Sequence, residues 1–163
     1  MATLLVQLSD RSWTTEALHH ACALARQMQV TVTLLRLIPV RHASYLGTDL
    51  CSLSPSAQEE ADLSEFGATA EDYGVECVVQ PMQYLDELSA LADAAELLDA
   101  VVVFARAPVR RRTWWNRLQM WSLKHRLAAF GSRLVTLEQP LRFGELNAAS
   151  ESASQPHHVV GVG

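Results

Sequence analysis

Short apolar runs alternate with amphipathic stretches along most of the chain. Five runs are short, apolar and rich in aliphatic or β-branched residues, which favours β-strands. The predicted strands are residues 3–8, 30–40, 75–80, 100–105 and 134–137. The stretches between them carry apolar residues at helical spacing, as Leu18, Ala21, Cys22, Ala25 and Met28 do in the first. The pattern therefore predicts alternating strands and helices.

Four helices are predicted, and capping residues mark the ends of two of them. The first covers residues 15–29, the third covers 86–98, and the fourth lies within 113–130. Ser54 followed by Pro55 suits the N-cap and first position of the second helix, whose apolar face is Leu63, Phe66, Ala70 and Tyr73. Gly74 and Gly131 suit the position that ends a helix in the left-handed conformation.

This alternation predicts an α/β domain with a doubly wound, five-stranded parallel sheet and helices on both faces, because helical crossovers join parallel strands. The uninterrupted apolar run at 100–105 is typical of a central strand covered on both faces. The domain spans residues 1–138, and the Ala/Ser/Gly/Pro-rich segment 139–163 is predicted to be a flexible C-terminal tail. Ligands of such sheets bind at the carboxyl ends of the strands, here residues 9–14, 39–45 and 106–113.

Composition narrows the class of protein. The 163 residues are 49% hydrophobic, which suits one globular domain. We expect neither a transmembrane helix nor a signal peptide, because no apolar run is long enough to span a membrane and the first residues lack a basic segment before an apolar core. Cys22, Cys51 and Cys77 form no CxxC pair, so we expect reduced thiols in a cytoplasmic protein. The six histidines lack metal-ligand spacing, and neither a metal nor a cofactor is expected.

Charge is distributed unevenly along the chain. Residues 101–137 hold eight basic residues and no acidic one, whereas the remaining residues hold 5 Lys/Arg and 18 Asp/Glu. The basic residues are Arg106, Arg110, Arg111, Arg112, Arg117, Lys124, Arg126 and Arg133. Three of the four tryptophans lie in the same segment, at Trp114, Trp115 and Trp121. A concentrated positive field attracts anions, phosphates or anionic surfaces, so the segment is a candidate binding region.

Several segments resemble the universal stress protein family. LLVQLSDRSWTTEALHHACALA is similar to the family's opening strand, polar turn and helix, and VTVTLLRLIPV to its second strand. DAVVVFARA resembles the fourth strand with its following loop, and SRLVTLE resembles the fifth. The resemblance covers about residues 2–138. It implies the parallel α/β fold and, for the family's ATP-binding members, a nucleotide site.

Two features of that nucleotide site are missing here. The family's ATP-binding members end the first strand with Asp, whereas this chain has Ser9, followed by Asp10. They also have a G-x2-G-x9-G-[S/T] loop after the fourth strand, but no glycine follows that strand until Gly131. Phosphate loops need glycine for positive φ and close backbone approach. Gly131-Ser132 comes after the fourth helix instead of opening it, so the resemblance implies a degenerate member without the ATP loop.

No catalytic motif is recognisable. The sequence contains no G-x-S-x-G elbow, Walker A loop or H-E-x-x-H motif. Asp10, Ser12 and Thr14 stand between a strand and a helix, where turn and cap residues are common. We therefore expect no enzyme activity and assign no catalytic residue.

The fourth helix has two apolar faces when its residues are placed about 100° apart. Leu123 and Leu127 lie on one side with Met120 and Phe130, and we expect this side to cover the sheet. The opposite side carries Trp114, Leu118, Trp121 and Ala128, with Trp115 at its margin, Arg117 and Lys124 along one seam, and Gln119 and Arg126 along the other. An apolar patch bordered by charge is typical of an interaction surface, and Trp and Arg are enriched in interface hot spots.

Several partners fit this surface. A protein is one, including a membrane-bound complex on which the domain would sit, and an anionic lipid surface is another. Nucleic acid ranks last because the rest of the chain is acidic. Alternatively, the C-terminal tail or a homodimer covers the Trp face.

We accordingly predict a non-catalytic docking or accessory subunit that binds a protein complex, at the cytoplasmic face of the membrane in one version of the hypothesis. Its partner-binding residues would be Trp114, Trp115, Leu118, Trp121, Arg117 and Lys124. The alternative is a stress-response protein that binds a nucleotide or another anion. In that case the arginines would replace the glycine loop, and they are Arg106, Arg110, Arg111 and Arg112.

Overall fold

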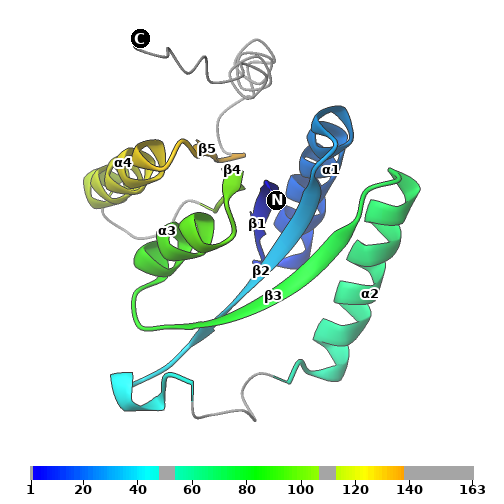
Figure 1. The fold of residues 1–163 in the computed structure, drawn as a ribbon. Helices are drawn as coiled ribbons and strands as arrows, with labels where there is room; N and C mark the ends of the chain where they lie inside the picture. Colours follow the sequence, from blue (N-terminus) through cyan, green and yellow to red (C-terminus); the bar gives the residue numbers. More distant parts are fainter. Residues whose placement is uncertain (1, 48–53, 107–112, 138–163) are drawn as a thin grey trace, which may run out of the picture.

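The predicted doubly wound sheet is confirmed by a computed structural model, which describes residues 2–47, 54–106 and 113–137 (Figure 1). Five parallel strands stand in the order β3-β2-β1-β4-β5. Their bounds are β1 Thr3–Gln7, β2 Thr31–Pro39, β3 Cys77–Tyr84, β4 Ala100–Phe104 and β5 Arg133–Val135. The strand order reverses between β1 and β4, which places the topological switch point between these two strands.

Helices cover both faces of the sheet (Figure 1). They are α1 Arg11–Met28, α2 Ala57–Asp72, α3 Glu87–Leu97 and α4 Thr113–Ala129, with a short 3-10 turn, η1, at Ala43–Tyr45. Residues of α1 and α2 pack into one hydrophobic cluster, and residues of α3 and α4 pack into the other. Within the described residues, no helix is long and apolar enough to cross a membrane.

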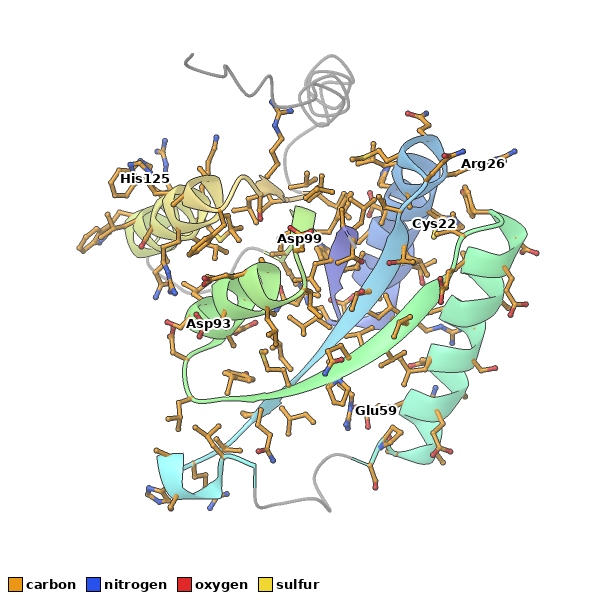
Figure 2. All side chains as sticks on the ribbon, in the orientation of Figure 1. Cys22, Arg26, Glu59, Asp93, Asp99 and His125 are labelled. Carbon is orange, nitrogen blue, oxygen red and sulfur yellow. The ribbon has the colours of Figure 1, made fainter. Side chains whose placement is uncertain are left out.

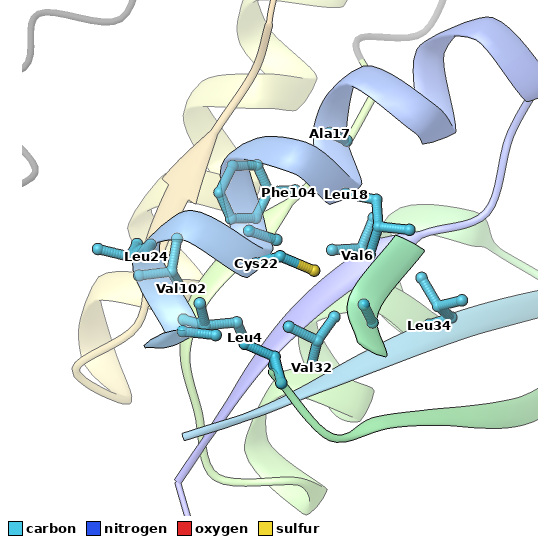
Figure 3. Packing of buried hydrophobic residues seen from close by; sticks show 14 of the residues in the cluster. Leu4, Val6, Ala17, Leu18, Cys22, Leu24, Val32, Leu34, Val102 and Phe104 are labelled. Atoms are coloured by element: carbon cyan, nitrogen blue, oxygen red, sulfur yellow. The ribbon is translucent and has the colours of Figure 1, made fainter. Parts of the chain in front are cut away.

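The central strand β1 shows why its residues 4–6 are all apolar. Leu4 and Val6 point into the cluster under α1 and α2, where Cys22 and Phe104 also lie (Figure 3). Leu5 points the opposite way, into the cluster under α3 and α4. Successive side chains of a strand alternate between faces, so consecutive residues in the middle of a strand covered on both sides are all apolar.

Two predicted helix starts were wrong. Asp10 is the N-cap of α1 and accepts a hydrogen bond from the backbone N–H of Trp13 at 3.0 Å, so this helix begins four residues earlier than expected. The cap of α2 is Ser56 instead of Ser54. Ser56 and Glu59 form a capping box, in which each side chain accepts from the other residue's backbone N–H, and this reciprocal bonding fixes the start of the helix.

Two strand ends also differ from prediction. β3 extends to Tyr84, beyond Pro81, because it is an edge strand of the described sheet, in which it pairs with β2 alone. The backbone carbonyls of Glu76 and Tyr84 accept hydrogen bonds from β2 or from the residue just after it. These two residues therefore face β2, as does every second residue between them. Pro81 stands at one of the other positions, whose N–H groups point away from the sheet. A proline is tolerated there because no ladder hydrogen bond is lost. β5 runs from Arg133 to Val135 instead of over 134–137.

The predicted helix-ending glycines are confirmed. Gly74 after α2 has φ +69°, and Gly131 after α4 has φ +78°. These are left-handed conformations, which glycine adopts without steric cost. Gly131 therefore ends a helix, and Ser132 next to it donates a hydrogen bond to the carbonyl of Ala100 at 2.6 Å. The predicted tail, 139–163, lies outside the described residues.

Candidate functional site

Helix α4 is anchored by one face and exposed on the other, as its sequence predicts. Leu123 and Leu127 are buried in the cluster that covers β1 and β4. On the opposite side, the exposed fractions are 59% for Trp114, 46% for Leu118 and 61% for Trp121. Ala128 is also exposed. Three large apolar side chains and Ala128 thus lie on a solvent-facing strip, which we call the Trp face: Trp114, Leu118, Trp121 and Ala128.

One residue of the predicted buried face was placed wrongly. Phe130 is 48% exposed. The helix ends at Ala129, and the backbone N–H of Phe130 bonds the carbonyl of Leu127 in a tighter turn. Phe130 therefore does not follow the spacing of about 100° per residue from which its position was predicted. Met120, predicted on the same face, is partly buried against the cluster as expected.

The basic residues of α4 have different environments. Arg126 pairs with Asp93 of α3 at 3.2 Å and donates to the Ser89 hydroxyl at 3.3 Å. Its charge therefore helps join the two helices. Arg117 and Lys124 are exposed and have no acidic partner within the described part of the chain. They supply the unneutralised positive charge beside the Trp face.

An aromatic contact lies along the Trp face. The His125 ring meets Trp121 edge-on, with the ring centroids 5.1 Å apart, and Figure 2 shows His125 on the outer side of α4. Aromatic pairs prefer this geometry. His125 was not among the predicted binding residues, although its helical position adjoins that of Leu118. The side chain of Trp115, which was among them, lies outside the described residues.

A polar network spans the switch point between β1 and β4. The guanidinium of Arg106 donates to the Ser9 hydroxyl at 3.0 Å and pairs with the Asp10 carboxylate. The backbone N–H of Arg106 donates to Gln7 Oε1 at 3.0 Å, and Gln7 Nε2 donates to Glu87 of α3. The carboxyl ends of the two strands are thus connected through side chains, at the place where this fold class binds ligands.

This network bears on the predicted anion site. The guanidinium of Arg106 already donates hydrogen bonds to Asp10 and Ser9 of its own chain, so an incoming anion would compete with Asp10 for this group. Asp10 has a second structural role, since its side chain also caps the N-terminus of α1. The other three predicted anion ligands, Arg110, Arg111 and Arg112, lie outside the described residues. Sequence reasoning missed Gln7, which is 4% exposed, although a glutamine inside an apolar strand is a visible signal.

A shallow hollow of about 140 Å³ lies between α2 and the ends of β1 and β2. Two arginines border it, and α2 carboxylates neutralise both. Arg36 pairs with Glu59 at 3.2 Å, and Arg11 pairs with Asp62 and Glu65. Sequence reasoning missed this hollow. Its charges already cancel one another, so the geometry gives it no preference for a charged ligand.

The two cysteine thiols in the described part of the chain, Cys22 and Cys77, are unsuited to nucleophilic chemistry at neutral pH. Burial raises the pKa of Cys22 to about 11, with a further contribution from Cys77. Burial likewise raises the pKa of Cys77 to about 11. The reactive thiolate is therefore scarce at neutral pH. No group of three potential metal ligands occurs among the residues that the structure describes.

Comparison with known proteins supports the fold. No family model matches the chain, and no curated protein matches it. A universal stress protein solved in complex with cAMP is similar with TM-score 0.59 at 14% identity, covering 83% of this chain and 96% of that one. A universal stress protein from Archaeoglobus fulgidus gives TM-score 0.54 at 16% identity, covering 83% and 93%. The A. fulgidus protein in complex with dAMP gives 0.51 at 14% identity, covering 83% and 97%.

These likenesses define the class of fold. The chain has the universal-stress-protein fold over most of its length, as the sequence resemblance implied. Identities this low establish the architecture alone. The function must therefore be argued from the residues of this chain.

Proposed function

We propose that this protein is a non-catalytic docking subunit that binds a protein partner through the Trp face of α4. The observation that supports this proposal is the exposure of Trp114, Leu118 and Trp121 on a helix that Leu123 and Leu127 already anchor. Folding does not require a second apolar face on this helix. Exposed Trp beside basic side chains is the composition of an interface hot spot.

The charge beside the Trp face indicates the partner's chemistry. Arg117 and Lys124 stand seven residues apart along one flank, without acidic partners in the described structure. A partner with an apolar groove bordered by carboxylates would bury the tryptophans and neutralise both cations. Such a partner could be free or part of a membrane-bound complex.

Site-specific photocrosslinking tests the proposal. A photoreactive residue at Leu118 should crosslink to a discrete partner, which mass spectrometry then identifies, and Trp114→Ala/Trp121→Ala should abolish the crosslink. The same probe at Ala23, exposed on α1, is the control. Equal crosslinking from both positions, or none from 118, would refute docking through this face.

A second candidate is nucleotide or anion binding. It is favoured by the cAMP and dAMP complexes of two proteins with this fold and by Arg106 at the switch point. It ranks lower because Asp10 and Ser9 already engage Arg106. Calorimetric titration with nucleotide tests this candidate.

A further inference from the structure

The outer face of α2 matches the Trp face of α4 in the sign of its charge and in the spacing of its residues. We propose, on the basis of the proposed docking function, that the partner of the Trp face is α2 of a second copy of this chain. The two helices lie on opposite sides of the sheet (Figure 1), so one chain cannot bring its own α2 and α4 together. The contact therefore requires another molecule.

Charge complementarity is the first argument. Helix α2 contains six acidic residues and no Lys or Arg. Glu59, Asp62 and Glu65 pair with arginines of their own chain, whereas Glu60, Glu71 and Asp72 are exposed and have no such pair among the described residues. On α4 the segment around the Trp face contains only basic charges. Opposite potentials of this kind steer association and disfavour wrong partners.

Matching spacing is the second argument. Trp114 and Trp121 are seven residues apart, which places them about 10.5 Å apart along the helix axis. Ala61 and Ala68 on α2 have the same separation, and both are exposed. Large side chains repeated every seven residues pack into gaps of equal spacing on a second helix. Small residues on α2 thus leave room for the tryptophans of α4.

Acidic side chains border this alanine row on both sides. Glu60 and Glu71 lie on one flank when residues are placed about 100° apart, and Asp72 lies on the other beside Glu65, which already pairs with Arg11. Carboxylates would therefore meet Arg117 and Lys124 whichever way the two helices run. An α4–α4 contact in a symmetric dimer would instead bring like charges together.

The geometry predicts the type of assembly. An α2–α4 contact is heterologous, so each added copy leaves one α2 and one α4 unoccupied. Association should then continue beyond a dimer into longer chains, or close into a ring. One helix face is smaller than the roughly 800 Å² per partner of a standard interface, so we expect weak, concentration-dependent association.

Complementation between two blocked variants tests this proposal. Ala61→Arg/Ala68→Arg blocks α2 with bulk and positive charge, and Trp121→Glu/Lys124→Glu blocks α4. Sedimentation equilibrium should show that the wild type exceeds the mass of a dimer at high concentration, whereas each variant alone stays monomeric. An equimolar mixture of the two variants should form a dimer and no larger species, because it has one intact α2 and one intact α4.

The controls preserve both surfaces. Ala23→Arg on α1 and Leu97→Glu on α3 introduce the same new residues at exposed positions elsewhere, and they should assemble like the wild type. Circular dichroism should show for every variant that the protein is folded. Raising the ionic strength from about 0.05 to about 0.5 M shortens the Debye length and should weaken the mixed dimer several-fold.

Three results would overturn the proposal. They are a wild type that stays monomeric, a mixture that stays monomeric, and self-association of the α2-blocked variant, which would indicate α4–α4 pairing. Trp121-dependent binding to phosphatidylserine vesicles without a mixed dimer would assign the Trp face to lipid instead. Continued crosslinking of position 118 to a different, identified protein would leave the docking function intact while this inference fails.

Discussion

Arg106 and Asp10 form an ion pair between the carboxyl ends of β4 and β1, although they are 96 residues apart in the chain. The pair spans the switch point, where proteins of this fold class bind their ligands. Asp10 simultaneously caps α1, so both partners have structural roles. A nucleotide phosphate would have to displace this contact before it could use Arg106.

We therefore expect weak or no ATP binding. No glycine in residues 105–113 can present backbone N–H groups to the phosphates, and Arg106 is engaged by Asp10. Calorimetric titration with Mg-ATP measures this directly, with cAMP as a second ligand. A micromolar dissociation constant for either would reverse the ranking of the two candidate functions.

Truncating the buried face of α4 should destabilise the protein, whereas truncating the Trp face should not. Leu127→Ala removes a fully buried side chain and should lower the free energy of unfolding by about 2–5 kcal/mol. The double substitution Trp114→Ala/Trp121→Ala should change the free energy of unfolding little. Urea denaturation measures both, and Leu97→Ala, at a leucine that is 74% exposed, is the matched control. A reversed order of effects would show that α4 is oriented the other way.

Gln7 should stabilise the switch point. Gln7→Ala removes the acceptor of the Arg106 backbone N–H and the donor to Glu87, so unfolding free energy should fall by about 1–3 kcal/mol. Gln58→Ala, at an exposed glutamine on α2, should have an effect within about 0.5 kcal/mol. Equal effects of the two substitutions in urea denaturation would argue against a structural role for this network.

Glu59 should give the protein part of its acid sensitivity. The hydrogen bond from the Ser56 backbone N–H holds the pKa of Glu59 below its ordinary value of 4.5, with Arg36 contributing. Because the folded pKa is the lower one, the stabilisation is present above pH 4.5 and is lost as the pH falls through the folded pKa. Glu59→Gln should therefore reduce the loss of unfolding free energy between neutral and acidic pH by about 0.5–1 kcal/mol.

Urea denaturation at several values between neutral and acidic pH measures that difference. Glu60→Gln, at the exposed neighbour outside the capping box, provides the control. If the free energy of unfolding depends on pH in the same way for both variants and the wild type, the capping box does not contribute to the acid sensitivity.

The three consecutive arginines should accelerate association through long-range charge. Replacing Arg110, Arg111 and Arg112 by Gln should slow the association rate at low salt and matter less at high salt, because exposed charges are screened over about 8 Å at physiological ionic strength. Stopped-flow measurement with the crosslinked partner tests this. A loss that is independent of salt would indicate short-range contacts, and no change at any salt would remove these arginines from the binding surface.

Periodicity predicted the fold because each element must bury a defined face. The apolar run at 100–105 and the alternation of strands and helices predict a covered parallel sheet, which β4 and its neighbours confirm. Element ends were less predictable. Ser54 and Ser56 are both suitable caps, and only the reciprocal bond with Glu59 distinguishes them. Similarly, Pro81 is compatible with β3 only because that strand lies at the edge.

The sequence by itself determined which face of α4 is buried, because Leu123 and Leu127 recur at helical spacing and lead directly into β5. It also determined which segment carries the concentrated positive charge, since the position of each Arg and Lys is read directly from the sequence. Only the tertiary structure decided which of those charges remain unneutralised. Arg126 is paired because α3 packs against α4 and presents Asp93, whereas Arg117 and Lys124 are exposed and have no acidic partner among the described residues. Such pairing depends on distances between residues far apart in the chain, which local patterns do not encode.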